Sequence, residues 1–332
     1  MKHLTLFKKQ FDDAFNSYLD SKVILFNKID PHGGEMTECI QEFVGYGGKR
    51  FRPALFHFAY ESFSKTKDTD SLKFSFIFEL FHTFALIHDD IIDNARLRRG
   101  NQTVHLKSGL AMGILAGDFA LTLADELFVD IIFSSHLSPS IKKQSIALYN
   151  QYKQELLIGQ YLDSKHFGSS EKIMLLKTAQ YSFTRPVLFG LLFAGLTQKE
   201  VNFWETFMTD LGMLFQLKDD YEGIMGNEKK MGKSATSDTE EGKNTIIVEL
   251  FKKKANKQEL ARFHSFFGKH GMTNEDVNWY KNKIQEKLID IEIKSRISSS
   301  CKKLFQELQT TLGVQTDLHI LAQEILDHIQ MI

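Results

Sequence analysis

One stretch of the chain, residues 79–100, runs from an almost uncharged segment into three aspartates and then into arginines. Its first half carries apolar side chains at helical spacing, which predicts a helix buried on most of its circumference. Asp89 and Asp93 fall one turn apart on the same face of that helix, with Asp90 about 100° round the axis. Carboxylates at this spacing repel one another unless a cation bridges them. The pattern therefore fits a site for Mg²⁺, which takes carboxylate oxygens and leaves the rest of its shell to water and phosphate.

Taken alone, the aspartate motif fits equally well a solvated acidic turn at the end of a surface helix. The residues that follow it favour the metal site, because Arg96, Arg98 and Arg99 come within two turns. Guanidinium groups bind diphosphate oxygens in a planar, forked geometry. The stretch therefore predicts a place where a metal ion and cations meet a phosphorylated ligand.

The length and composition of the chain favour one helical body. Its 332 residues are 42% hydrophobic, include only 4 prolines and show helical spacing almost throughout. A chain of this size can fill one large core, and no linker-like stretch divides it. We therefore expect a single all-α domain over residues 1–332, with helices that include 141–162, 171–193 and 199–221.

Charge and targeting signals narrow the classes of function. The 41 basic and 42 acidic residues give a net charge of −1, so the sequence offers neither a basic field nor a motif for nucleic acid. The longest apolar window, residues 186–196, is too short to span a bilayer, and the N-terminus lacks the apolar run of a signal peptide. Cys39 and Cys301 cannot build a disulfide framework. We expect a cytoplasmic protein with no nucleic-acid partner and no integral membrane segment.

A second acidic pair, Asp219 and Asp220, again closes an apolar helical segment, in the sequence FQLKDDYEG. One such cluster is common, but two of them, each at the end of a buried helix, indicate opposite walls of one metal-filled cavity. The 29 phenylalanines could simply fill the core. The alternative is that some of these rings line a cavity for an apolar substrate.

Two further segments carry cations. Residues 45–53, GYGGKRFRP, form a basic turn that combines glycines, which allow a tight bend, with Lys49, Arg50 and Arg52. Pro53 predicts the first residue of the next helix. Residues 223–245 lack hydrophobic periodicity and hold four lysines. Composition alone favours a disordered surface loop. The alternative is a functional lid, because long loops inside compact domains tend to be functional. Lysines on such a lid would close over a phosphate.

Together these features describe a reaction between two diphosphates. A metal-held diphosphate on an apolar chain is a leaving group, and its departure leaves an allylic cation that survives only where water is excluded. The separate basic turn implies a second anion, held by Lys and Arg rather than by metal. Two diphosphates bound in different ways suggest the joining of two units.

Several spaced motifs over residues 45–245 resemble, in order, those of the trans-isoprenyl diphosphate synthases of the polyprenyl synthetase family. They are GGKRFRP, HDDIID followed by LRRG, GQYLD, FQLKDD and the glycine-lysine pairs of the lysine-bearing segment. The resemblance implies an all-α bundle of the isoprenoid synthase type around a central apolar cavity, and a homodimer. It also implies ionisation of an allylic diphosphate, head-to-tail addition of isopentenyl diphosphate and loss of a proton. Three Mg²⁺ ions are expected when diphosphate is bound.

The resemblance also assigns roles to individual residues. It implies metal binding by Asp89, Asp93, Asp163 and Asp219, supported by Asp90 and Asp220, with Asp238 a weaker candidate acting through water. It implies binding of the allylic diphosphate by Arg98, Lys177, Lys233 and Lys243. It implies binding of isopentenyl diphosphate by Lys49, Arg52, His82 and Arg99. Thr178 and Gln216 would face the reacting carbons.

Several of these residues have plainer explanations outside the resemblance. Lys177 and Thr178 fit a solvent-facing helix surface, His82 fits an ordinary core histidine, and Gln216 fits a cap or a bridge between helices. Only their positions within the set of motifs favour the site.

The chain departs from the family pattern at Gly223, where many members have a third aspartate, and Glu222 lies beside it. Part of the family carries this glycine, so the departure indicates a subtype. It leaves the role of Glu222 open.

Side chains upstream of the first acidic motif would form the floor of the tunnel for the growing chain. Phe84 is large, its neighbour Ala85 is small, and Phe81 lies one turn deeper. This pattern resembles members that make the twenty-carbon product, geranylgeranyl diphosphate. The fifteen-carbon product, farnesyl diphosphate, is the alternative.

Two other functions fit part of the pattern. A class I terpene cyclase shares the first motif, but it needs no second diphosphate site, and its second motif has other residues at Gly223 and Asn227. A catalytically silent subunit of a heteromeric synthase typically loses acidic motifs, and this chain keeps both. The residues therefore favour a short-chain prenyltransferase.

Overall fold

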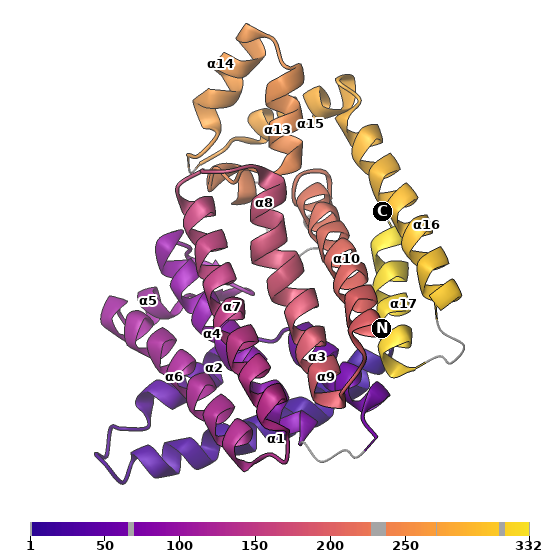
Figure 1. Ribbon diagram of the computed structural model, residues 1–332. Coiled ribbons are helices and arrows are strands. Elements are labelled where there is room, and N and C mark those ends of the chain that lie inside the picture. Colours follow the sequence, from indigo (N-terminus) through magenta and orange to yellow (C-terminus); the bar gives the residue numbers. More distant parts are fainter. Residues whose placement is uncertain (1, 66–69, 227–236, 270, 312–315, 332) are drawn as a thin grey trace. The chain divides into compact units, whose positions relative to one another are not determined.

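The computed structural model describes residues 2–65, 70–226, 237–269, 271–311 and 316–331 (Figure 1). This part of the chain is almost entirely helical, and its two short strands, β1 (Leu97–Arg98) and β2 (Asn101–Gln102), pair as one antiparallel hairpin. The expected all-α fold is confirmed. None of the helices described combines the length and the apolar character needed to cross a bilayer.

The chain divides into two compact units. Unit 1 comprises Met1–Tyr152, Ser182–Glu205 and Gln315–Ala322, and unit 2 comprises Lys153–Tyr181, Thr206–Val314 and Gln323–Ile332. Each boundary between the units that falls in the described residues lies inside a helix rather than in a linker. The expectation of one domain over residues 1–332 stays a prediction.

Unit 1 begins with the N-terminal helices. They are α1 (Lys2–Phe26), α2 (Glu35–Gly45), α3 (Phe51–Phe63), α4 (Ser71–Ile92), α5 (Val104–Lys107) and α6 (Leu110–Ser134). The first part of helix α7 (Pro139–Ser164), up to Tyr152, follows, and α9 (Arg185–Ala194) belongs to the same unit. Helix α4 is the central element, because it packs against both α3 and α6.

The residues of α4 explain why it forms and where it lies. The Asp70 side chain caps its N-terminus by accepting a hydrogen bond from the Lys73 backbone N–H, at 2.9 Å. Phe74 and Phe78 on α4 contact Phe56 of α3 and Phe189 of α9, with ring centroids 4.6–6.0 Å apart. These aromatic contacts fix the helix that carries the first acidic motif.

A glycine sets the close approach of α9 to α3. A Cβ atom at Gly190 would lie 2.6 Å from Ala59 Cβ and 2.7 Å from the Phe56 carbonyl oxygen. Any side chain there would push the two helices apart. The apolar window at 186–196 is thus a buried core helix rather than a membrane segment.

The structure corrects three of the predicted helices. The segment 171–193 is not one α-helix but α8 (Ser170–Met174), the π-helix η1 (Leu175–Thr184) and then α9. Helix α3 starts at Phe51, so Pro53 lies inside its first turn, where the missing N–H is still not needed. Helix α10 (Gln198–Met225) continues past the second acidic pair through Gly223.

Unit 2 contains most of the C-terminal helices. They are α12 (Ser237–Glu240), α13 (Ile246–Lys254), α14 (Lys257–Phe266), α15 (Asn274–Glu286), α16 (Ile289–Thr311) and the end of α17 (Asp317–Gln330). Phe251, Phe263 and Tyr280 form an aromatic core with ring centroids 5.0–5.1 Å apart. This part of the unit supports the fold, and none of the predicted site residues lies in α13–α17.

Candidate active site

The first acidic motif ends α4 in unit 1. Asp93 is the C-cap residue, and its backbone N–H donates to the Asp89 carbonyl oxygen at 2.9 Å, which confirms that the two residues are one turn apart. Both are partly buried, whereas Asp90 is 1% exposed. The motif therefore offers two reachable carboxylates and one that is buried.

Arg98 holds the buried aspartate. Its Nε donates to Asp90 Oδ1 at 2.9 Å, its Nη2 contacts the same oxygen, and that Nη2 lies 3.6 Å from Asp89 Oδ2. Burial raises the pKa of Asp90, Arg98 lowers it, and the neighbouring charge of Asp89 raises it again. Arg98, which the sequence assigns to the allylic diphosphate, is thus anchored at the acidic motif by Asp90.

The donor atoms at this end of α4 suit a hard cation. Asp90 Oδ2 is buried without a hydrogen-bond partner among the described residues, and Asp89 and Asp93 add two partly buried carboxylates. Oxygen-only sets of this kind are what Mg²⁺ prefers. No group of three or more His, Cys, Asp or Glu side chains in the described ranges is gathered closely enough to enclose a metal ion. Metal binding by Asp89, Asp93, Asp163 and Asp219 stays a prediction.

The basic residues predicted for the second diphosphate gather in unit 1. Arg52 Nη2 donates to Ser182 Oγ at 2.6 Å, and the Arg99 guanidinium donates to the Gly47 carbonyl oxygen. Burial lowers the pKa of His82 well below its usual value, and the charges of Arg52, Arg99, Arg98 and Arg50 lower it further. His82 is therefore a neutral ring on which the charges of four guanidinium groups act. Lys49 is exposed on the turn at residues 45–53.

In unit 2, Lys177 and Asp163 form an ion pair, with Lys177 Nζ 2.6 Å from Asp163 Oδ2. Gly159 permits it, because a Cβ atom there would lie 2.9 Å from Leu176 Cβ and 3.0 Å from Lys177 Cγ. Sequence reasoning gave these two residues separate roles, on the diphosphate and on a metal. The structure shows that each partly neutralises the other.

A chain of hydrogen bonds runs from η1 to the second acidic motif. Thr178 Oγ1 donates to Gln216 Oε1 at 2.5 Å, and Gln216 Nε2 donates to Asp220 Oδ1 at 2.7 Å. Thr178 lies in the π-helix, a rare element that is frequent at functional sites. The structure thus brings together three residues that the sequence singled out, and Asp220, 5% exposed, orients the Gln216 amide.

The rest of the second motif separates into an exposed carboxylate and a buried ion pair. Asp219 is exposed, whereas the Lys218 side chain is 2% exposed and its Nζ lies 2.8 Å from Glu222 Oε1. Glu222 therefore neutralises a buried lysine. This contact gives Glu222, the residue beside the glycine at 223, a structural partner.

The lysine-bearing segment is described only in part. Lys233 and the side chain of Asp238 lie outside the described residues. Lys243 Nζ lies 2.5 Å from Glu241 Oε2. The predicted lid stays a prediction.

The predicted tunnel-floor residues lie on one side of α4. Phe81 is fully buried, Phe84 is 6% exposed, and their ring centroids are 5.4 Å apart. Ala85 is partly buried beside them. Tyr152 of α7 contacts Phe81 at 4.8 Å. Sequence reasoning missed Tyr152, because no motif marks it.

Comparison with known proteins places this geometry in a family. The model of the family described as "Polyprenyl synthetase" matches residues 34–284. The chain is 30% identical over 324 residues to a geranylgeranyl diphosphate synthase of Sulfolobus acidocaldarius, covering 90% of this chain and 97% of that protein. It is 33% identical over 245 residues to a farnesyl diphosphate synthase of Geobacillus stearothermophilus, covering 70% and 80%.

A solved structure shares the fold along the whole chain. The geranylgeranyl pyrophosphate synthase of Corynebacterium glutamicum, complexed with isoprenyl diphosphate and magnesium, matches with a TM-score of 0.86 and 25% identity, covering 98% of each chain. The fold and the matched motifs define an all-α prenyltransferase of the short-chain type. The chain belongs to the polyprenyl synthetase family.

Proposed function

We propose that this enzyme joins an allylic diphosphate to isopentenyl diphosphate, head to tail, and that its main product is geranylgeranyl diphosphate. One observation carries the proposal: unit 1 contains two chemically different places for an anion. The first is the carboxylate end of α4, which suits a metal-bound diphosphate. The second is the group of guanidiniums around His82, which suits a diphosphate bound without metal. A reaction that joins two diphosphates needs both.

The proposed metal is Mg²⁺, with three ions in the loaded enzyme. It would be held by Asp89, Asp93, Asp163 and Asp219, and when bound it supplies the positive charge that neutralises the departing diphosphate. Cations of the chain add to this neutralisation, and the proposed set is Arg98, Lys177, Lys233 and Lys243. The proposed set for isopentenyl diphosphate is Lys49, Arg52, His82 and Arg99. The metal-free character of the second set would keep the two substrates apart.

Thr178 and Gln216 would stabilise charge on the reacting carbons. The Thr178 hydroxyl donates its hydrogen bond to Gln216 Oε1, so the lone pairs of the hydroxyl oxygen stay available to a nearby positive charge. Gln216 in turn is fixed by Asp220. A held oxygen next to a carbocation stabilises it without reacting, provided that water is excluded.

The test of the reaction uses the purified chain with Mg²⁺. Dimethylallyl or farnesyl diphosphate is supplied with and without isopentenyl diphosphate, and the products are separated by chromatography. Elongation that requires both substrates supports the proposal. Products from the allylic substrate alone would indicate a terpene cyclase instead, and the absence of any product would indicate a silent subunit.

We propose that Phe84 sets the product length. Phe84→Ala should lengthen the product, because the ring that closes the floor of the tunnel is removed. The control is Phe76→Ala, since Phe76 is 4% exposed on the same helix but packs against Phe11 and Phe15 of α1. The control should lose stability, about 3–5 kcal/mol at most, without changing the product. An unchanged product from Phe84→Ala would show that the floor lies elsewhere.

We propose a homodimer of single-domain subunits that works in the cytoplasm. Leu115, Val129 and Phe133 are 48–79% exposed along one face of α6, and a second copy of the chain would cover them. Cys39 and Cys301 are both free thiols, which suits a reducing compartment. Light scattering on the purified protein measures the mass: a dimer supports the assembly, and a monomer at assay concentration contradicts it.

A further inference from the structure

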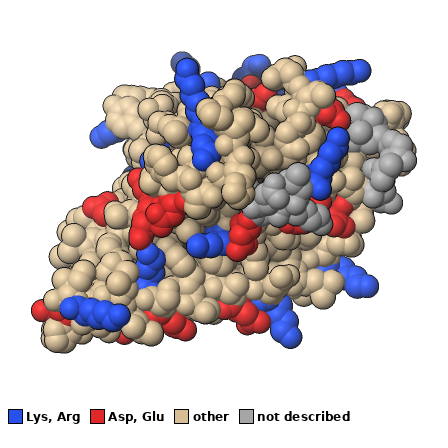
Figure 2. All heavy atoms as spheres, turned by 60° about the horizontal axis from the view of Figure 1, so that its bottom comes forward, with Lys and Arg blue, Asp and Glu red and all other residues tan. Residues whose placement is uncertain are grey.

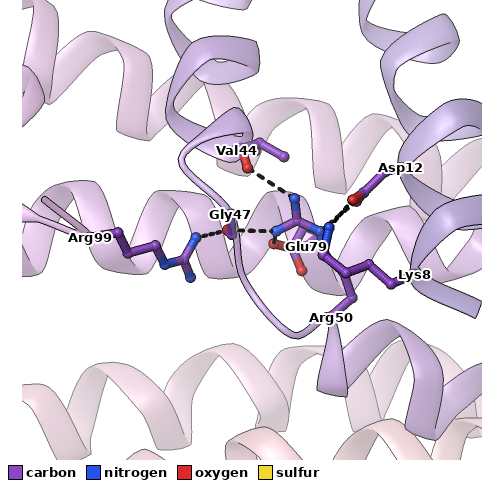
Figure 3. Close-up of polar contacts among 7 residues, drawn as sticks. All are labelled: Lys8, Asp12, Val44, Gly47, Arg50, Glu79 and Arg99. Atoms are coloured by element: carbon purple, nitrogen blue, oxygen red, sulfur yellow. Dashed lines mark hydrogen bonds and ion pairs between the residues drawn. The ribbon is translucent and has the colours of Figure 1, made fainter. Parts of the chain in front are cut away.

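Arg50 behaves differently from the other cations of the basic turn. Lys49 is exposed, but the Arg50 side chain points inward and is only 5% exposed (Figure 3). Its backbone adopts a φ of 56°, in the left-handed region that a non-glycine residue seldom occupies. Such a backbone conformation is unfavourable for a residue with a side chain, so the surrounding contacts must hold it in place.

The Arg50 guanidinium joins four parts of unit 1. Nε donates to Asp12 Oδ1 of α1 at 2.7 Å, and Nη1 donates to Glu79 Oε1 of α4, also at 2.7 Å. Nη1 further donates to the Gly47 carbonyl oxygen at 3.2 Å, and Nη2 donates to the Val44 carbonyl oxygen at the end of α2 at 2.9 Å. Charge-assisted bonds of this kind are roughly twice as strong as neutral ones. Figure 3 shows the guanidinium at the centre of these contacts.

The same turn positions Arg99. The Gly47 carbonyl oxygen that accepts from Arg50 also accepts from Arg99. A Cβ atom at Gly48 would lie 2.8 Å from Arg50 Nη1 and 3.1 Å from both terminal nitrogens of Arg99. Both guanidiniums therefore lie close against the Gly47–Gly48 backbone. A shift of Arg50 moves the carbonyl that holds Arg99.

The charges around this turn leave a surplus of cations. Burial lowers the pKa of Arg50, but its interactions with Glu79 and Asp12 raise the pKa by more, so the net effect is a raised pKa. Arg99 has a lowered pKa, first through desolvation and then through Arg50, Arg98 and Arg52, with only Glu79 opposing. An anion bound beside Arg99 would relieve this repulsion.

We propose that Asp12 and Glu79 are positioning residues for isopentenyl diphosphate, which act through Arg50 and the Gly47 carbonyl to aim Arg99 at the substrate. The inference rests on the proposed function, and it names a part of the chain that lies before the matched family region, since Asp12 belongs to α1. Asp12 also pairs with Lys8, so its negative charge is shared between the helix and the turn. In this arrangement the N-terminal helix contributes to substrate affinity without touching substrate.

Asp12→Asn tests the proposal, with Asp13→Asn as the matched control. Asp13 is exposed on the same helix, so the control removes the same charge one residue away. Titration calorimetry with isopentenyl diphosphate in the presence of EDTA measures the metal-free site, and the fitted stoichiometry reports the folded fraction. We expect Asp12→Asn to weaken binding roughly tenfold at unchanged stoichiometry, and Asp13→Asn to bind like the wild type.

A double variant separates positioning from a general structural role. If Asp12 acts through Arg99, then in an Arg99→Ala background the further change Asp12→Asn should alter binding less than twofold. In steady state, Asp12→Asn should raise KM for isopentenyl diphosphate and leave KM for the allylic diphosphate unchanged. Equal losses with and without Arg99, or equal rises in both KM values, would overturn the proposal.

The same experiment distinguishes this inference from the proposed function. A wild-type chain that binds isopentenyl diphosphate in EDTA but does not elongate would refute the function and leave the inference intact. A chain that elongates, but whose Asp12→Asn variant binds like the wild type, would refute the inference alone. If the wild-type protein does not bind isopentenyl diphosphate in EDTA, that result too would refute the inference.

Discussion

The two acidic motifs, at the end of α4 in unit 1 and near the end of α10 in unit 2, use their paired aspartates in the same order. In each pair the first aspartate, Asp89 or Asp219, is the more exposed, and the second, Asp90 or Asp220, is buried. The buried partners differ: a charged guanidinium bonds Asp90, whereas a neutral amide bonds Asp220. Each doubled aspartate thus combines one reachable carboxylate, the proposed metal ligand, with one buried carboxylate that positions a neighbour, and the positioned group differs between the motifs.

The flanking residues widen the difference. The first motif has a third aspartate, Asp93, where the second has Gly223. Just before this glycine, Glu222 neutralises the buried Lys218, a task for which the first motif has no counterpart, because Ile92 occupies the matching position. In the second motif, one of the three carboxylates therefore neutralises a lysine of the motif itself.

Figure 2 shows acidic and basic side chains interspersed on one face of the molecule, where the described residues form no broad field of one sign.

The largest effects should come from the exposed aspartates. Asp89→Asn and Asp219→Asn should each lower kcat by roughly 10²–10³-fold, because each removes charge that would hold metal at the departing diphosphate. Steady-state kinetics measures both. The control is Asp130→Asn on α6, which removes an exposed carboxylate outside the motifs. If only one of the two motif variants loses activity, the two motifs do not serve the same reaction.

The buried aspartates should rank next, and they should differ. Asp90→Asn should lower kcat about tenfold, because a neutral amide no longer holds the charged Arg98 in place. Asp220→Asn should cost about two- to threefold, since the new side-chain oxygen can still accept from Gln216. Kinetics on the two variants, with circular dichroism to confirm the fold, gives the order. A reversed order would indicate that Asp220 binds metal directly.

Glu222→Gln should affect stability rather than turnover. It leaves the buried Lys218 with a neutral partner, so the free energy of unfolding should fall by about 1–2 kcal/mol while kcat stays within about twofold. Asp210→Asn is the control, because its partner Lys303 is exposed and such pairs contribute less than about 1 kcal/mol. Urea unfolding measures both. A large loss of kcat in Glu222→Gln would make Glu222 part of the metal site.

The last expected effect is a pH dependence of stability at His82 on α4. The pKa of His82 is lowered in the folded chain, so below about pH 6.5 the unfolded state binds a proton that the folded state does not. Stability should therefore fall on acidification, by up to about 1.4 kcal/mol per pH unit from this group. His82→Gln should reduce that slope between about pH 6.5 and 5 in urea unfolding. An unchanged slope would show that the pKa of His82 is the same in the folded and unfolded states, and would contradict a neutral ring beside the arginines.

Local patterns were enough to predict some features and not others. The acidic end of α4 follows from helical spacing, because one turn sets the separation of Asp89 and Asp93. The π-helix could not be predicted, since apolar periodicity over ten residues does not distinguish it from an α-helix. The same holds for pairs joined only by the tertiary fold: Lys177 meets Asp163 because Gly159 lets η1 approach α7. Arg50 lies in a recognisable motif, but nothing near Asp12 marks it as a partner 38 residues away.

The left-handed backbone at Arg50, with the ion network that holds it, sets stability against the proposed affinity for isopentenyl diphosphate. Glycine would relax that backbone, and buried ion networks can often be exchanged as a whole for well-packed neutral side chains at no loss of stability. A directed-evolution campaign that screens only for heat resistance should therefore discard Arg50, Asp12 and Glu79 together. A campaign that screens for product should keep all three.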